Sequence, residues 1–295
     1  MRAGNKVKGF IIYLAIFGLV AGVLYFDSVA KADATEIKIA ATIFPLANIA
    51  SHIVGEKGKV ITILPAGANP HTFELTPQEI KELGGVRMIF AIGHGLDDWV
   101  KRTGESLPQA RTVIVDQSIA LVHTNEEDPH YWVSIVNVKI IAGNIARALA
   151  DVDPARKNEY EANLGLYSVR LDEADRNIRK LLSDLPARKI VTFHDGWRYF
   201  ARDYDLEVVG NVESSHGSEP TPKRLARLGG IIREQKIKVL FSEPAVSKTV
   251  AESLAKDFKL HVYELDPFGD SKPKQDFIDL MTANARIIHE ALNHG

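Results

Sequence analysis

Histidine is the residue type in this sequence with the clearest potential for chemistry. The chain of 295 residues contains ten histidines and no cysteine. The lack of cysteine excludes disulfides, thiolate catalysis and every cysteine-based zinc site, which leaves histidine with aspartate or glutamate as the strong metal ligands. A single histidine is most often a surface or structural residue, so position along the chain has to select among the ten.

Three histidines lie at, or just past, the end of a predicted element, and each has a proline or glycine nearby. His71 follows an Asn-Pro pair, His130 follows an Asp-Pro pair, and His194 ends the apolar strand 190–193. Open α/β sheets bind ligands at the carboxyl ends of their strands, so His194 has the strongest positional argument. The alternatives are a turn residue for His71 and a helix entry that packs on the core for His130.

A zinc ion held by three neutral imidazoles needs a fourth ligand, and a carboxylate there would also compensate its charge. Asp266 lies just past the predicted strand 260–263, although it also fits a plain turn aspartate before proline. Glu243 competes with it at the end of another strand, and Glu213 and Glu219 are weaker candidates. Asp195 could orient the His194 ring or cap the following helix.

The elements that would position these side chains alternate between strand and helix. Apolar alternation predicts strands at 37–42, 60–64, 87–92 and 112–115, and again at 189–193, 207–209, 239–241 and 260–263. Helical spacing predicts helices at 46–54, 133–150 and 274–292, and Thr76 with Glu79 forms a capping box at another helix start. This order predicts an α/β fold with two lobes, each a mostly parallel sheet flanked by helices.

A long polar segment separates the two sets of strands. Between residues 154 and 185 one apolar stripe recurs at helical spacing, formed by Tyr160, Leu164, Tyr167, Leu171, Ile178 and Leu182. We interpret the segment as a long connecting helix, which favours limited rocking of the lobes over wide closure. The predicted domains are residues 35–152 for the N-terminal lobe, 153–186 for the helix and 187–295 for the C-terminal lobe, with the metal site in the cleft between the lobes.

The N-terminus has the layout of a secretory signal peptide. Three basic residues precede an apolar run at 10–26, and small residues suitable for cleavage follow at 30–34. We therefore predict a signal peptide over residues 1–34, with an uncleaved anchor as the alternative, and an exported location for the rest of the chain. The net charge of −2 does not produce the basic field that nucleic-acid binding requires.

Taken together, several motifs of the chain resemble the zinc- and manganese-type solute-binding proteins (ZnuA/TroA-like, cluster A-I) that serve bacterial ABC metal importers. The resemblance covers the whole chain after the leader. The matching strings are ATIFPL at 41–46, GANPHTFELTP at 67–77, GHGLDDW at 93–99, DPHYW at 128–132, FHDGWRYF at 193–200 and SEPTP at 218–222.

The resemblance implies a metal site formed by His71, His130, His194 and Asp266. Manganese-type members have a glutamate where this chain has His194, so zinc is the expected metal, with Mn²⁺ or Fe²⁺ as alternatives. Many zinc-type members carry a long His- and Asp-rich loop before the second ligand, whereas this chain has only residues 123–128 there, and we expect His123 to be an exposed loop residue.

The resemblance also implies capture of the metal for transport rather than catalysis. The expected partners are an ABC importer permease and its ATPase, the expected state is a monomer, and the expected location is the periplasm or the outer face of the cytoplasmic membrane. Two alternatives remain, a secreted metallohydrolase and a surface adhesin. Against the hydrolase, the sequence has no His-Glu-x-x-His helix, no Gly-x-Ser-x-Gly elbow and no phosphate loop.

Overall fold

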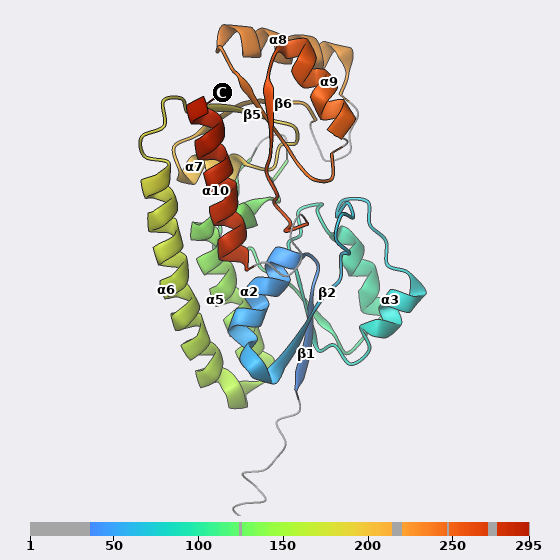
Figure 1. Cartoon of the computed structure of the whole chain (residues 1–295). Coiled ribbons are helices and arrows are strands. Elements are labelled where there is room, and N and C mark those ends of the chain that lie inside the picture. Colours follow the sequence, from blue (N-terminus) through green and yellow to red (C-terminus); the bar gives the residue numbers. More distant parts are fainter. Residues whose placement is uncertain (1–35, 124–125, 214–219, 247, 271–275, 295) are drawn as a thin grey trace, which may run out of the picture. The chain divides into compact units, whose positions relative to one another are not determined.

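The first four strands form one parallel sheet (Figure 1). The computed structural model describes residues 36–123, 126–213, 220–246, 248–270 and 276–294. The strands lie in the order β2-β1-β3-β4, and every neighbouring pair is parallel. Their bounds are Ile37–Ala41 for β1, Gly58–Thr62 for β2, Met88–Ala91 for β3 and Arg111–Ile114 for β4. The central strands β1 and β3 are almost wholly buried, as expected for strands covered on both faces.

The next four strands repeat this arrangement in a second parallel sheet. Their order is β6-β5-β7-β8, so in both sheets the second strand along the chain lies at one edge, beside the first. The bounds are Lys189–Thr192 for β5, Glu207–Asn211 for β6, Val239–Ser242 for β7 and His261–Glu264 for β8. The predicted α/β fold with two parallel sheets is confirmed.

Short helices connect the strands within each half. In the first half these are α2 (Phe44–Val54), α3 (Pro77–Glu82) and α4 (Thr103–Ser106), with 3₁₀ turns at Gly55–Lys57 and Asp98–Arg102. In the second half they are α7 (Arg198–Asp203), α8 (Pro222–Glu234) and α9 (Lys248–Phe258). The predicted capping box is present at α3, where the Thr76 hydroxyl accepts from the Glu79 amide and the Glu79 carboxylate accepts from the Thr76 amide.

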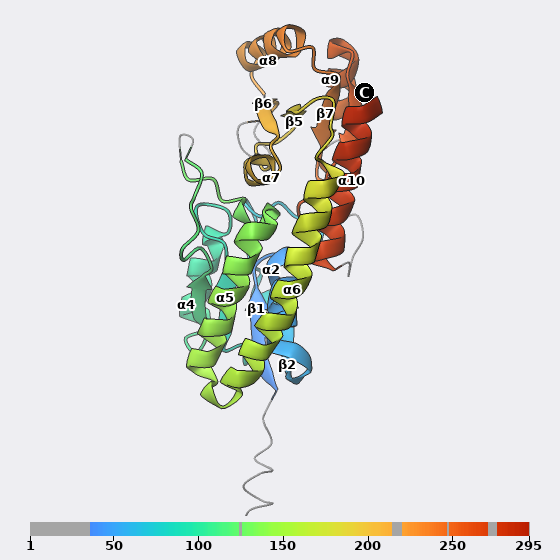
Figure 2. The ribbon, with the colours of Figure 1, turned by 90° about the vertical axis from the view of Figure 1, so that its left-hand side faces the viewer.

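Three longer helices lie beside the sheets (Figure 2). A 3₁₀ turn at Tyr131–Val133 leads into α5 (Ile135–Val152), and another at Pro154–Arg156 leads into α6 (Lys157–Leu181). The final helix, α10 (Phe277–His294), returns along the chain to pack against α6 and α2. The predicted stripe of α6 is turned inward, with Tyr160, Tyr167, Leu171, Ile178 and Leu182 buried and Leu164 partly buried.

One hydrophobic cluster extends from the first sheet to the second. It includes Ile39 of β1, Leu171 of α6, Phe241 of β7 and Met281 of α10, all buried. Smaller clusters cover the opposite face of each sheet. The predicted domain limits at residues 152 and 186 stay predictions. Residues 1–34, the predicted leader, lie outside the described part of the chain, and none of the helices in the described part is long and apolar enough to cross a bilayer.

Candidate metal centre

His71 is presented by the turn-rich segment after β2. Its backbone amide donates to the Asn69 side-chain oxygen at 2.9 Å, which closes the turn around Pro70. The carbonyl of Pro70 in turn accepts a hydrogen bond from the indole nitrogen of buried Trp99 at 2.9 Å. Hydrogen bonds at Asn69 and Pro70 therefore fix the loop that carries His71. The His71 side chain itself stays partly exposed.

His130 is held by a carboxylate two residues earlier in the chain. The Asp128 Oδ1 atom accepts from both the backbone amide and the Nδ1 of His130, at 2.9 and 2.8 Å. A carboxylate only accepts hydrogen bonds, so Nδ1 carries the proton and the lone pair of the ring lies on Nε2. This Nε2 is buried and has no hydrogen-bond partner among the described residues. A buried ring nitrogen with a lone pair and no hydrogen-bond partner is suited to bind a metal ion.

His194 follows β5 directly and is buried next to a second carboxylate. Its Nδ1 lies 3.3 Å from Oε1 of Glu243, which also accepts a hydrogen bond from the Trp197 indole nitrogen at 3.1 Å. By the same argument as for His130, this contact places the His194 proton on Nδ1 and the lone pair on Nε2. Glu243 thus orients His194 in the way that Asp128 orients His130.

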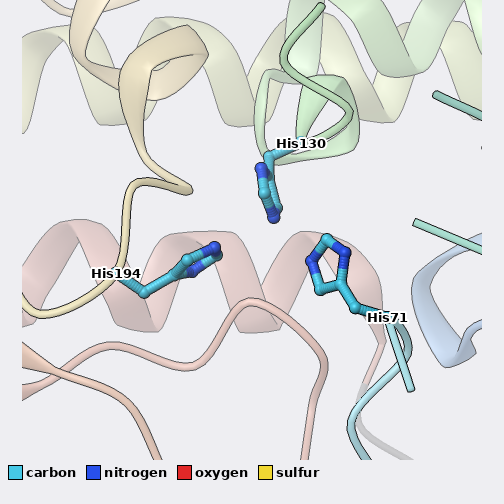
Figure 3. Close-up of side chains that lie close together, drawn as sticks. All are labelled: His71, His130 and His194. Atoms are coloured by element: carbon cyan, nitrogen blue, oxygen red, sulfur yellow. The ribbon is translucent and has the colours of Figure 1, made fainter. Parts of the chain in front are cut away.

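The three histidines converge from three separate segments (Figure 3). One ring nitrogen of each lies within 4.8 Å of the others, and this is the one group of its kind among the described residues. Ring centroids lie 4.6 Å apart for His130 and His194, 5.9 Å for His71 and His130, and 6.4 Å for His71 and His194. Three imidazoles around one point suit a transition-metal ion such as zinc.

Gly196 permits the close approach of two of these rings. A Cβ atom at this position would lie 2.8 Å from Cε1 of His194 and 3.4 Å from Cδ2 of His130. The first distance is shorter than a van der Waals contact, so any side chain here would displace the His194 ring. The glycine that marked His194 in the sequence therefore has a steric role.

The charges around His194 raise the pKa of its ring. Burial lowers the pKa of the His194 ring, but the charge and hydrogen bond of Glu243, with smaller effects of Asp195 and Asp128, raise the pKa above its ordinary value. A proton and a metal ion compete for the Nε2 atom, so metal binding should weaken as the pH falls.

Asp266, the fourth predicted ligand, lies outside the three-histidine group. It is buried, and its Oδ1 accepts from the backbone amides of Phe268, Gly269 and Asp270 at 3.0, 2.7 and 3.2 Å. Its own amide donates to the Asn284 side chain of α10. The carboxylate therefore shapes the turn after β8, and its role as a metal ligand stays a prediction.

The other residues singled out in the sequence have different surroundings. Asp195 pairs with Arg198 and does not cap α7, whose N-cap is Trp197, so the predicted capping role is wrong. His123 is exposed, as predicted. Glu213 is partly buried and outside the three-histidine group, and Glu219 lies outside the described residues.

Sequence reasoning missed the supporting role of Asp128. The only signal was its position in the Asp-Pro-His string, because a carboxylate two residues before a histidine can reach the Nδ1 of that ring. Glu243 was recognised as a carboxylate at a strand end, yet its contact with His194 joins residues far apart in the chain.

The comparisons with known proteins agree with a metal site. The family model described as zinc-uptake complex component A, periplasmic, matches residues 39–291. The chain is 27% identical to the high-affinity zinc uptake system protein ZnuA of Bacillus subtilis (strain 168), over 98% of each protein. It is 28% identical to the manganese ABC transporter substrate-binding lipoprotein PsaA of Streptococcus anginosus, over 96% of this chain and 97% of PsaA.

A solved structure supports the same assignment. The crystal structure of ZnuA superimposes with a TM-score of 0.79 at 29% identity, covering 87% of this chain and 99% of that chain. The chain is about as similar to a zinc-uptake protein as to a manganese-binding one. These sequence identities therefore do not show which of the two metals this chain binds. Because the family model spans nearly all of the described residues, the chain belongs to the ZnuA family of metal-binding solute-binding proteins that serve ABC importers.

Proposed function

We propose that the protein captures Zn²⁺ outside the cytoplasm and delivers it to the permease of an ABC importer. The observation that carries this proposal is the convergence of one ring nitrogen each from His71, His130 and His194 within 4.8 Å. His130 is already oriented by Asp128 and keeps a buried Nε2 without a hydrogen-bond partner among the described residues. A site prepared in this way needs little rearrangement to accept an ion.

Zinc is proposed over manganese or iron because of the donor atoms. Imidazole nitrogen suits Zn²⁺, whereas Mn²⁺ prefers carboxylate, carbonyl and water oxygens. In the proposed ligand set, Asp266 supplies the fourth donor and the negative charge that three neutral imidazoles lack. Asp266 is buried next to β8, which favours a closed set of protein ligands over a site that keeps a water.

The exposure of the three rings favours entry of the ion from the side of His71. The His130 and His194 side chains are buried, whereas His71 is partly exposed and lines a pocket of about 430 Å³ together with Phe73 and Trp99. We infer that the hydrated ion meets His71 first and loses its remaining waters to the two buried rings. A closed shell then holds the ion without offering an open coordination position.

The family excludes one of the two alternatives, and the surface adhesin stays an alternative. Its members are solute-binding proteins and not enzymes, so the metallohydrolase alternative is wrong. The family is extracytoplasmic, in agreement with the predicted leader at residues 1–34. We place the chain in the periplasm or on the outer face of the cytoplasmic membrane, with residues 35–152 and 187–295 as the two lobes.

Calorimetry of residues 35–295 with Zn²⁺ tests the proposal. We expect a Kd of about 50 nM or tighter for one ion, since closed zinc sites contribute about 10 kcal/mol or more. A His71→Ala and His194→Ala double variant leaves one imidazole and should weaken binding at least about 100-fold. The matched control is His123→Ala with His261→Ala, because both of these histidines are exposed.

The metal that the protein carries in its native envelope is a separate question. Most nitrogen and oxygen sites bind Zn²⁺ more tightly than Mn²⁺ in a test tube, so affinity alone does not identify the cargo. Metal analysis of protein purified from that envelope should find zinc. Manganese or iron in the purified protein, or unchanged zinc affinity in the double variant, would refute the proposal.

A further inference from the structure

His94 has a backbone conformation that is uncommon for a residue with a side chain. It follows β3 between two glycines, and its φ is 53°, with 80° at Gly93 and 81° at Gly95. The buried Asp97 carboxylate accepts from the amides of Ile92 and Gly93, at 2.8 and 2.7 Å, and fixes this turn. Ser118, Asp205, Lys236 and Lys259 also have positive φ, so the conformation of His94 gains weight only from the contacts of its side chain.

The His94 ring lies between two carboxylates from different segments. Its Nε2 is 2.8 Å from Oδ2 of Asp116, just past β4, and its Nδ1 is 2.5 Å from Oε2 of Glu127. Each ring nitrogen faces a carboxylate oxygen at hydrogen-bonding distance, so the His94 ring bridges the two carboxylates. The bridge joins the first sheet to the segment that leads to His130.

That segment is fixed at a few further points, all close to Glu127. The Asp128 amide donates to the Val122 carbonyl at 2.9 Å, and His123 forms an antiparallel bridge with Glu127. The Tyr199 hydroxyl accepts from the Val122 amide at 2.9 Å and donates to the Asp128 carbonyl at 2.7 Å. The residue after Glu127 is Asp128, whose carboxylate orients the His130 ring.

We infer that His94 is a positioning residue for the metal centre: its bridge to Glu127 fixes Asp128, and through Asp128 the ring of His130. The inference rests on the proposed role of His130 as a ligand. His94 lies outside the three-histidine group and does not bind the ion itself. The His94 side chain is 15% exposed and that of Glu127 is 44% exposed, so the bridge lies near the surface. A substitution of His94 should therefore leave the hydrophobic core intact.

The test compares His94→Asn with the wild type and with a His261→Asn control. Asparagine also tolerates positive φ but is too short to reach Glu127, so the substitution removes the bridge and keeps the turn. Residues that orient a metal ligand directly change affinity by 10- to 100-fold, and His94 acts one contact further away. We expect about 3- to 10-fold weaker Zn²⁺ binding in His94→Asn, faster release, and a changed visible spectrum of the Co²⁺-loaded protein.

Epistasis separates positioning from a general loss of stability. If His94 acts through Asp128, then His94→Asn should change the affinity less than about two-fold in an Asp128→Asn background. The melting temperature of each metal-free variant shows whether the fold is kept. Wild-type affinity, release rate and Co²⁺ spectrum in His94→Asn would overturn the inference, as would full additivity with Asp128→Asn. A wild-type protein that binds neither metal would overturn the proposed function as well.

Discussion

At the residue scale, the metal centre depends on how closely two imidazoles approach each other. His130 and His194 have ring centroids 4.6 Å apart, and each ring is turned by a carboxylate at its Nδ1. The carboxylates do more than hold the rings in place, because a negatively charged acceptor at Nδ1 increases the basicity of Nε2. The carboxylates thus set both the orientation of the two rings and the basicity of their Nε2 atoms.

A Gly196→Ala substitution tests how far this geometry matters. The new methyl group would lie 2.8 Å from Cε1 of His194, so the ring must move away from its place opposite His130. We expect about 10- to 100-fold weaker Zn²⁺ binding, measured by competition with a chelator, and a loss of stability of about 1–3 kcal/mol from overpacking.

Gly143→Ala is the matched control. It lies inside α5, where an added Cβ meets no atom within 4 Å, and it should leave the affinity unchanged. Wild-type affinity in Gly196→Ala would mean that the separation of His130 and His194 does not limit binding.

At the element scale, one carboxylate joins three helices. Asp276, just before α10, accepts from Nε2 of His52 on α2 at 2.8 Å and from Arg170 on α6 at 3.0 Å. It also accepts from the Ile278 amide, while the His52 ring stacks on Tyr167 with centroids 4.4 Å apart. The start of α10 is thereby tied to the two helices it packs against.

This carboxylate should make the stability of the protein depend on pH. Burial raises the pKa of Asp276, but hydrogen bonds from His52, the Ile278 amide and Arg170 outweigh burial and lower the pKa below its ordinary value. A carboxyl whose pKa is lowered in the folded state stabilises the protein above its unfolded pKa of about 3.9, and this contribution is lost as the pH falls.

Urea unfolding of the wild type and Asp276→Asn measures this contribution. We expect the variant to be less stable by about 1–3 kcal/mol at pH 7, with the difference shrinking as the pH falls below about 4. Asp279→Asn, on the first turn of the same helix, controls for the loss of one negative charge there. A difference that does not depend on pH would contradict the assigned cause.

Many of the helices and strands could be predicted from the sequence because they depend on local patterns. The alternation of strands and helices, the capping box at Thr76 and the inward stripe of α6 all follow from spacing along the chain. The contact of His52 with Asp276 and that of His194 with Glu243 could not, because they join residues distant in sequence that only the folded chain brings together. The convergence of His71, His130 and His194 also joins distant residues, and it was expected from positions at element ends and from the family resemblance, whereas the role of Asp266 stays a prediction.

At the scale of the whole molecule, one continuous core connects the two sheets. The same hydrophobic cluster contains Ile39 of the first sheet and Phe241 of the second. The Trp132 indole nitrogen, close to His130 in the chain, donates to the Pro267 carbonyl beside Asp266 at 3.0 Å. A shared, close-packed core resists wide separation of its parts, so we expect metal capture by small local shifts rather than hinge opening.

The central claim is that His71, His130 and His194 together bind one zinc ion. Anomalous diffraction at the zinc absorption edge, on crystals of the zinc-loaded protein, tests it most directly. We predict a single anomalous peak about 2.0–2.1 Å from one nitrogen of each histidine, with an Asp266 oxygen completing a tetrahedron. A peak at another position, or zinc bound by fewer than these three imidazoles, would contradict the account.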